Sequence, residues 1–448
     1  MVRLSLLLTA SAAQLSRQLS VPRAVNNTSL PLLKFSSKGT LQICVFSDMH
    51  FGQYESGKGP EQDRSTIRVI SDVLDYEKPD LVVLNGDLTN GDTISGFNGT
   101  HYIDQIVAPL IERNLTWAST YGNHDHSLYA SGDSILEREQ MFAGSRTRKM
   151  VETDGSGTTN YYLPVYSAKC ESTSSCAPQL LLWFFDSRGG SRYQGEAQPN
   201  WVDRSVADWF RETNEALVNK YNKTMPSLAF VHIPINATWS FQTQVGLSSH
   251  HQPGIDEEPA CAQQGAGWCS NGSLTETCVY CGQDVPFMQA LVSVPGLIGL
   301  FYGHDHGQTW CVKWDRLLPG MTVPGNGINL CYGQHSGYGG YGDWIRGARE
   351  IIVTEEQLKN FAVDTHIRLE NGGVVGAVGL NATLNKDRYP ATPNQLTFLS
   401  RTEENGDIAV SLAPSSEARR IRWGGFLVAV QTAILQQVLG ACLGVRLF

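Results

Sequence analysis

Short apolar runs, each ended by a polar residue or a glycine, recur along the first 300 residues and predict buried parallel strands. The first two cover Leu41–Ser47 and Leu81–Asn85. Between them, apolar residues recur at helical spacing from Ile67 to Leu74, after a potential helix cap at Asp63 and before Pro79. This order is a βαβ unit. Similar runs predict strands over 117–120, 180–185, 228–232 and 297–302, and helices over 106–111 and 201–218.

Polar motifs come directly after, or at the end of, several of these strands. They are Asp48-Met49-His50, Gly86-Asp87, Gly122-Asn123-His124-Asp125, His232 and Gly303-His304-Asp305-His306. Because ligands bind at the carboxyl ends of parallel strands, we expect these side chains to converge. Carboxylate oxygen and imidazole nitrogen are ligands for divalent and trivalent ions. The motifs therefore predict a site for two adjacent metal ions.

The order and residue types of these motifs resemble those of the calcineurin-like metallophosphoesterases, over residues 40–355. The resemblance implies an α/β fold of four layers (αββα), in which two mixed β-sheets pack together between outer helices. It also implies that Asp87 bridges two metal ions, which could be Fe, Zn or Mn. The remaining ligands would be Asp48, His50 and His306 for one ion, and Asn123, His232 and His304 for the other.

The same resemblance implies hydrolysis of a phosphate monoester. A hydroxide bridging the two metals would attack phosphorus, and His124 would protonate the leaving group while Asp125 holds its second ring nitrogen. Two alternatives stay open: a phosphodiesterase acting on nucleotides or lipid head groups with the same site, and a catalytically inactive metal-binding scaffold. The complete ligand set favours an enzyme but does not separate monoesters from diesters.

Further strings resemble the purple acid phosphatases, a eukaryotic branch of this superfamily. They include Trp183–Ser187, Phe230–Pro234 and Tyr338–Gly342. Purple enzymes use a tyrosine three residues after the bridging aspartate as a ligand to ferric iron, and this chain has Asn90 there. Conversely, His50 occupies a position where purple enzymes have no ligand. We therefore expect no purple chromophore.

Four residues near the motifs are candidates for binding the substrate phosphate. The glycines between the two tyrosines permit close backbone approach, although a structural turn with packed tyrosines is the alternative. For the histidine after Asp125, the alternative is a solvent-exposed neighbour of the site. The candidates are His126, His335, Tyr338 and Tyr341.

Composition limits the class of protein and of partner. The chain has 448 residues, 41% of them hydrophobic and 17% charged, so it can bury a large core. Its formal net charge of −9, with no basic run along a predicted helix, excludes a nucleic-acid scaffold. A small phosphorylated substrate would have to be drawn by a local positive centre.

Several features predict entry into the secretory pathway, with an extracellular, cell-surface or vacuolar/lysosomal destination. Residues 1–20 contain Arg3 followed by an apolar stretch, as in a signal peptide. Asn-x-Ser/Thr acceptors recur, and we expect glycans at Asn27, Asn98, Asn114, Asn222, Asn271 and Asn381 but not at Asn236, which is close to His232.

Eight of the ten cysteines form pairs that are near in sequence, as in proteins of an oxidising compartment. The expected disulfides are Cys170–Cys176, Cys261–Cys269, Cys278–Cys281 and Cys311–Cys331. Within residues 261–281, exchanged partners and a zinc site stay open as alternatives. Cys44 is expected to be a buried thiol within a strand.

Three segments depart from the strand–helix alternation. Residues 240–284 lack periodicity and read as a disulfide-tied insertion that shapes the substrate pocket. Residues 356–415 form a β extension, with strands over 366–369 and 374–380 joined at Asn371-Gly372-Gly373 and closing the second sheet. The tail, 424–448, is nearly continuously apolar. It could be a GPI-anchor signal, a membrane helix or an amphipathic helix docked on the domain. The first two alternatives would attach the protein to a membrane.

Overall fold

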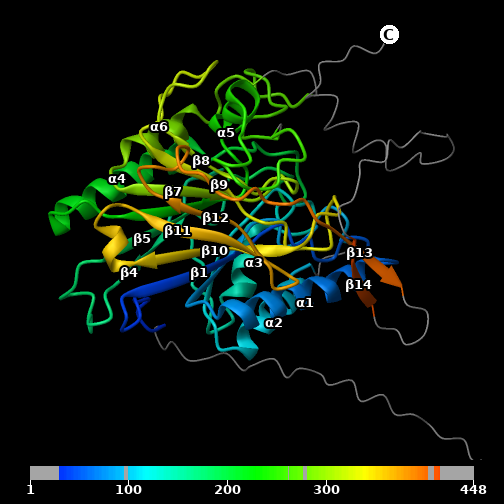
Figure 1. Ribbon diagram of the computed structural model, residues 1–448. Helices are drawn as coiled ribbons and strands as arrows, with labels where there is room; N and C mark the ends of the chain where they lie inside the picture. Colours follow the sequence, from blue (N-terminus) through cyan, green and yellow to red (C-terminus); the bar gives the residue numbers. More distant parts are fainter. Residues whose placement is uncertain (1–29, 95–98, 261, 276–279, 402–407, 414–448) are drawn as a thin grey trace, which may run out of the picture.

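The computed structural model describes residues 30–94, 99–260, 262–275, 280–401 and 408–413 (Figure 1). The expected signal peptide and the apolar tail lie outside the described residues. Within those residues, no helix combines the length and apolar character needed to cross a bilayer.

Two six-stranded mixed sheets form the centre of the molecule. In the first sheet, β1, β2 and β3 are parallel and β10 to β12 are antiparallel. Its order is β12 (Val374–Leu380), β11 (Val363–Leu369), β10 (Gly347–Thr354), β1 (Thr40–Phe46), β2 (Leu81–Asn85) and β3 (Trp117–Thr120). In the second sheet, β5, β6, β7 and β9 are parallel, and β4 and β8 pair antiparallel at its two edges. Its order is β4 (Tyr161–Val165), β5 (Leu180–Phe185), β6 (Ser227–Val231), β7 (Leu297–Tyr302), β9 (Ile328–Tyr332) and β8 (Cys311–Trp314).

Alternate residues of the central strands pack into different cores, which gives four layers. In β5, Leu180, Leu182 and Phe184 join the core between the two sheets. Trp183 and Phe185 face the opposite way, into the core beneath α4 and α6. Because side chains alternate across a strand, a continuous apolar run is what a strand buried on both faces requires. The predicted αββα architecture is confirmed.

Helices cover both outer faces (Figure 1). The first sheet is covered by α1 (Gly59–Glu77), α2 (His101–Glu112) and α3 (Gly132–Glu139). The second is covered by α4 (Arg204–Tyr221) and α6 (Val285–Ser293). The shorter elements are α5 (Asn236–Ser240), a π-helical turn η1 (Phe241–Val245) and α7 (Glu355–Leu358). A separate hairpin pairs β13 (Leu396–Arg401) with β14 (Ile408–Ala413).

Two expectations about elements need correction. The helix after β1 begins at Gly59, with Pro60 in its first turn, so Asp63 lies within the helix and does not cap it. Asp63 is buried, and its carboxylate accepts the backbone N–H of Gly52 at 3.2 Å. The hairpin β11–β12 extends the sheet that contains β1, because β11 pairs with β10.

Of the four expected disulfides, the two that lie wholly within the described residues, Cys170–Cys176 and Cys311–Cys331, are present. The second joins neighbouring residues of β8 and β9. Cys44 is a buried thiol, as expected. The other two expected pairs include Cys261 and Cys278, which lie outside the described residues, as do Asn27 and Asn98.

Candidate metal centre

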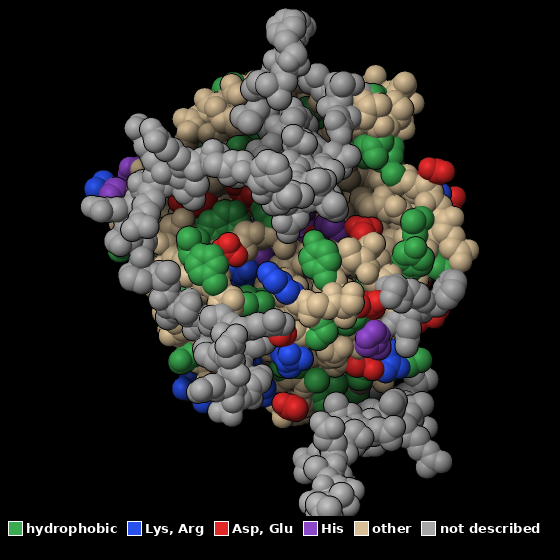
Figure 2. All heavy atoms as spheres, turned by 90° about the vertical axis from the view of Figure 1, so that its right-hand side faces the viewer, with side chains coloured by type: hydrophobic (Ala, Val, Ile, Leu, Met, Phe, Trp, Pro, Cys, Tyr) green, Lys and Arg blue, Asp and Glu red, His purple; other side chains and the backbone are tan. Residues whose placement is uncertain are grey.

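The motif residues lie at the carboxyl ends of strands from both sheets. Figure 2 views the molecule from this side, where histidine side chains lie near the middle of the face beside acidic and hydrophobic ones. At four of these positions the backbone adopts a positive φ: 57° at Asp48, 50° at His50, 49° at Asp87 and 77° at His304. Such left-handed conformations are uncommon outside glycine and cluster at functional sites.

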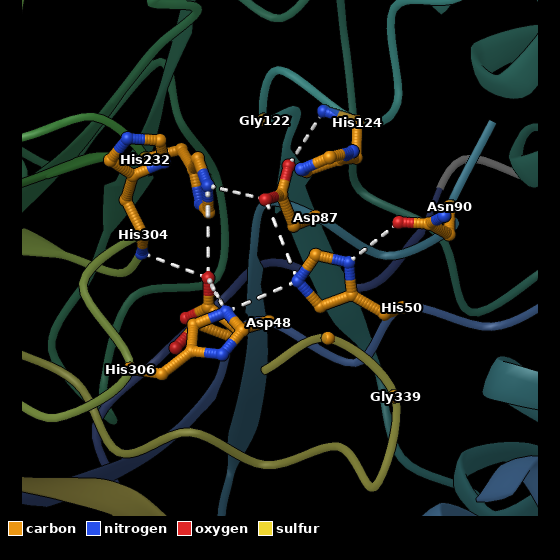
Figure 3. A network of polar contacts seen from close by, with 12 residues as sticks. Asp48, His50, Asp87, Asn90, Gly122, His124, His232, His304, His306 and Gly339 are labelled. Atoms are coloured by element: carbon orange, nitrogen blue, oxygen red, sulfur yellow. Dashed lines mark hydrogen bonds and ion pairs between the residues drawn. The ribbon is translucent and has the colours of Figure 1, made fainter. Parts of the chain in front are cut away.

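Nitrogen and oxygen atoms of these residues come close enough to share cations (Figure 3). Three overlapping groups have ligand atoms within 4.8 Å of one another: Asp48, His50 and His306; Asp87, His232 and His304; and His50, Asp87 and His124. The first two correspond to the two expected ligand sets, apart from Asn123. The third includes His124, which the resemblance assigns to the leaving group.

Three histidines have one ring nitrogen fixed by the fold and the other directed at carboxylates. The Nδ1–H groups of His50, His232 and His306 donate to Asn90 Oδ1 (3.0 Å), the Asn85 carbonyl (2.9 Å) and the Tyr341 carbonyl (2.7 Å). Their Nε2 atoms lie 3.1–3.8 Å from carboxylate oxygens of Asp48 or Asp87. Anchored Nδ1 atoms of this kind orient histidines that bind metal through Nε2.

Buried polar atoms that lack a hydrogen-bond partner among the described residues test whether this site fits metal ions. Asn123 Oδ1 and His232 Nε2 are two such atoms. Since buried polar atoms are nearly always paired, these atoms fit ligand positions for a cation. The described residues therefore fit a two-metal site of oxygen and imidazole ligands.

Burial and mutual charge set the protonation of the centre. Burial lowers the pKa of both His50 and His304 to about 3, which favours the neutral imidazole that binds metal. Burial alone would raise the pKa of Asp87, but the neighbouring His232 and His124 outweigh it and hold that pKa well below its usual value. Asp87 is thus an anionic ligand candidate at any physiological pH.

His124 lies at the edge of the centre with 34% of its side chain exposed. Its backbone N–H donates to Asp87 (2.8 Å), and its ring lies 5.0 Å from that of His50. Burial lowers its pKa, but the charges of Asp87 and Asp92 raise it to about 9 overall. The raised pKa favours the protonated imidazole, which is the form that a general acid requires.

The expectation that Asp125 orients His124 is wrong. His124 Nδ1 pairs with Asp92 at 2.9 Å. Asp125 is fully buried and accepts the backbone N–H groups of Leu88, Thr89 and Gly122. Asp125 thus joins the loops after β2 and β3, whereas Asp92 is the partner of the candidate acid.

Sequence comparison agrees with this geometry. The calcineurin-like phosphoesterase model matches residues 41–308, which is more than half of the chain. The chain belongs to the calcineurin-like phosphoesterase family.

Relatives of the chain include purple acid phosphatase-like proteins. It is 28% identical over 360 residues to the probable inactive purple acid phosphatase 28 of Arabidopsis thaliana, covering 73% of this chain and 79% of the relative. It is 26% identical over 325 residues to the phosphatase DCR2 of Saccharomyces cerevisiae, covering 68% of this chain and 50% of the relative.

Solved structures give weaker similarities. A dimetal phosphatase from Danio rerio matches with a TM-score of 0.45 and 11% identity, over 76% of this chain and 98% of that one. A purple acid phosphatase from yellow lupin (Lupinus luteus) matches with a TM-score of 0.42 and 12% identity, over 76% of this chain and 53% of that one.

In this chain, Asn90 and His50 form a hydrogen-bonded pair. Asn90 occupies the position of the purple enzymes' tyrosine, and its amide oxygen accepts the Nδ1–H of His50 (Figure 3). Asn90 in turn donates to Thr93 Oγ1 at 2.8 Å. The two departures from the purple pattern are thus structurally linked, because Asn90 orients the histidine that the purple enzymes lack.

Three of the four candidates for binding substrate phosphate hold the fold together. His126 is buried and pairs with Asp186 at 3.0 Å, so it is not a solvent-exposed neighbour either. His335 is buried, and its Nε2–H donates to the Gly339 carbonyl. Tyr338 donates its hydroxyl to Glu370 at 2.8 Å. These contacts engage His126 Nε2, His335 Nε2 and the Tyr338 hydroxyl within the protein, whereas the buried His335 Nδ1 has no hydrogen-bond partner among the described residues. A role for the three residues in binding substrate stays a prediction.

The fourth candidate, Tyr341, remains at the metal centre. Its ring stacks on His306 with centroids 4.0 Å apart, and 42% of the residue is exposed. The adjacent Gly340 allows this approach, because a Cβ there would lie 2.4 Å from His306 Cε1 and 2.8 Å from His50 Cδ2. A role for Tyr341 in binding substrate remains a prediction.

Three residues of the site escaped the motif analysis: Asp92, Asn90 as a partner of His50, and Glu258. Asp92 lies only five residues after Asp87, so its position in the sequence could have identified it as a residue of the site. Glu258 lies in the aperiodic 240–284 insertion and accepts the backbone N–H of Gly307 at 2.7 Å. No local pattern marks it, because Gly307 and Tyr341, its partners at the metal centre, are 49 and 83 residues away in the chain.

Proposed function

We propose that this chain is an active metal-dependent phosphatase that hydrolyses a phosphate monoester. The observation that carries the proposal is the convergence of Asp48, His50, Asp87, His232, His304 and His306 on one edge of the two sheets. The buried Asn123 Oδ1, which has no hydrogen-bond partner among the described residues, is the candidate for the remaining ligand atom. Asp48, His50, Asp87 and His306 would hold one ion, and Asp87, Asn123, His232 and His304 the other.

The chain's own residues have distinct parts in the reaction. Two bound metal ions would supply a nucleophile at neutral pH and positive charge for the phosphoryl oxygens. Asp87 and Asp48 provide the anionic ligands, and the anchored histidines fix the direction of their Nε2 atoms. His124, with Nδ1 held by Asp92, would donate a proton from Nε2 to the departing alkoxide.

The competing proposal is a metal-binding scaffold without turnover. It is suggested by the word "inactive" in the names of three relatives. The two proposals assign different roles to His124 and to its partner Asp92. A scaffold needs metal ligands alone, whereas this chain also places a histidine with a raised pKa beside Asp87. That feature supports the enzyme.

The first experiment measures metal content by mass spectrometry and ester hydrolysis before and after chelation. We expect about two metals per chain and turnover that a chelator abolishes and Mn, Zn or Fe restores. Metal well below this level, with no turnover after restoration, would favour the scaffold. The relative rates on monoesters and diesters decide between the phosphatase and the phosphodiesterase alternatives.

The second experiment tests the acid. His124→Ala should reduce turnover of an alkyl phosphate roughly 100-fold or more, since general acid catalysis contributes about 10²–10⁴. Esters with activated leaving groups should be affected far less, because they need little protonation. His101→Ala, a change of an exposed histidine at the start of α2, is the control. Full activity of His124→Ala on the alkyl ester would disprove the assignment.

We also propose that the protein enters the secretory pathway. The two disulfides are compatible with an oxidising compartment. Three of the expected glycan acceptors in the described residues, Asn114, Asn222 and Asn271, are exposed, and Asn381 is half-buried.

A further inference from the structure

The side chain of Glu258, in the insertion 240–284, contacts two loops of the metal centre. Its Oε1 accepts the hydroxyl of Tyr341 at 2.8 Å and the backbone N–H of Gly307 at 2.7 Å. The backbone carbonyl of Glu258 also accepts the side-chain amide of Gln308. Glu258 therefore joins the insertion to two loops, the one that carries His304 and His306 and the one that carries Tyr341.

Tyr341 in turn determines how His306 lies. Its ring stacks on one face of the imidazole at 4.0 Å and an interplanar angle of 10°, and the ring of His335 lies 3.8 Å away at 31°. The Tyr341 carbonyl accepts the Nδ1–H of His306 at 2.7 Å, and the Tyr341 hydroxyl accepts the His306 backbone N–H at 3.1 Å. The groups that hold Nδ1 and the two faces of this imidazole come from residues 335–341, whereas its Nε2 faces Asp48 and His50.

We propose that Glu258 and Tyr341 form a clasp through which the insertion sets the metal affinity of the site at His306. This inference rests on the proposed role of His306 as a metal ligand. Both residues are positioning residues: the Tyr341 hydroxyl can bridge Glu258 and His306 only while the insertion is docked. Among the described residues, no hydrogen bond joins Glu258 or Tyr341 to His232 or His304, the histidines of the other proposed site.

The physical basis is the cost of leaving a metal ligand free to rotate. Partners that orient ligating histidines typically change metal affinity about 10–100-fold when removed. Loss of Glu258 leaves the Tyr341 hydroxyl and the Gly307 N–H without their acceptor, which loosens both sides of His306 together. Because the clasp acts through one histidine, we expect the affinity of one of the two metal ions to fall.

The test titrates the metal-free full-length protein with Mn²⁺, and separately with Zn²⁺, by isothermal calorimetry. Glu258→Ala and Tyr341→Phe should each weaken one of two binding events about tenfold and leave the other unchanged. Glu258→Gln should restore most of the affinity, since its amide oxygen can accept both hydrogen bonds. The double variant Glu258→Ala/Tyr341→Phe should be little worse than either single variant, as residues of one network are not additive.

Matched controls come from the same two segments. Glu257 is the neighbouring exposed carboxylate, and Tyr338 has a hydroxyl engaged by Glu370. Glu257→Ala and Tyr338→Phe should bind both ions as the parent does. Melting temperatures of the metal-free variants show whether a change in affinity reflects a disturbed fold.

The outcomes separate this inference from the proposed function. If both clasp variants bind both ions as the parent does, or if they weaken both events equally with a lower metal-free melting temperature, the clasp is wrong even when the parent is an active phosphatase. If one event alone is weakened but the metal-loaded parent hydrolyses no ester, the clasp stands and the phosphatase proposal fails. A parent that binds no metal overturns both.

Discussion

Asp125 and Asp92 both lie close to His124, but they differ in burial and in their partners. Asp125 is fully buried, and its oxygens accept three backbone N–H groups and the Thr89 hydroxyl. Asp92 is 49% exposed and makes an ion pair with His124. Exposed pairs contribute little to stability, whereas a buried acceptor facing several donors contributes much more. Asp125 should therefore stabilise the fold, and Asp92 should act on the chemistry.

Asp125→Asn should lower the free energy of unfolding by about 1–3 kcal/mol, because the new amide N–H₂ must face backbone N–H donors in either orientation. Chemical denaturation of the metal-free protein measures this. Asp92→Asn is the matched control and should unfold as the parent does, while slowing hydrolysis of an alkyl phosphate. A stable Asp125→Asn variant would show that the carboxylate is not needed to join the loops.

Where β1 pairs with β10, the carboxyl group of Glu350 is buried. Cys44 of β1 lies opposite Glu350 of β10 in this antiparallel pair, on the face that α1 covers. Burial, with a smaller effect of Glu77, raises the pKa of Glu350 to about 8, although Cys44 and Gln42 oppose the rise by hydrogen bonding. Glu77 itself is paired with His366 and Arg368 of β11. The helix-facing side of this sheet thus contains a carboxyl group that prefers to be neutral.

Glu350 should make stability depend on pH. Its pKa in the unfolded chain is about 4.3. The folded protein therefore keeps a proton that the unfolded chain releases, so the contribution of Glu350 is full below that pH and is lost as pH rises to about 8. Glu350→Gln should flatten the fall in the free energy of unfolding between pH 5 and pH 8, measured with urea. The exposed Glu356→Gln is the control, and an unchanged slope in Glu350→Gln would refute the argument.

The candidate metal centre joins the two sheets of the molecule. Asp48, Asp87 and Asn123 follow strands of the first sheet, and His232 and His304 follow strands of the second. Ions bound by both sets would stabilise the packing of one sheet on the other. A ligand that binds only the native state at 1,000 times its Kd adds about 4 kcal/mol.

Removal of metal should therefore lower the melting temperature of the whole domain. Scanning calorimetry of the parent with and without a chelator measures the shift, and His232→Ala should reduce it. His101→Ala should leave the shift unchanged. Equal melting temperatures for metal-loaded and metal-free parent protein would show that the ions do not contribute to holding the sheets together.

Passage through the secretory pathway should leave a pattern of glycans that follows exposure. Asn114, Asn222 and Asn271 are exposed, whereas Asn236 is buried and its backbone N–H donates to Asp284 at 2.7 Å. Peptide mass spectrometry of protein from a secreting eukaryotic host should find glycans on exposed acceptors and none on Asn236. Absence of glycans from all three exposed acceptors would contradict the secretory proposal.

The layer order came from the family resemblance, and six strands, β4, β8, β9, β10, β13 and β14, were not predicted. The sequence by itself determined the other strands and the chemical identity of the candidate ligands. Those features are local: a run such as Leu180–Phe185 is apolar throughout because both faces of its strand are buried, and motif residues lie next to the strand ends that place them. Only the tertiary structure decided that Asp92 and not Asp125 meets His124, that His126 and His335 are internal, and that Glu258 reaches His306. The physical reason is that these contacts depend on the course of the loops and on chain segments up to 83 residues apart, which no local pattern encodes.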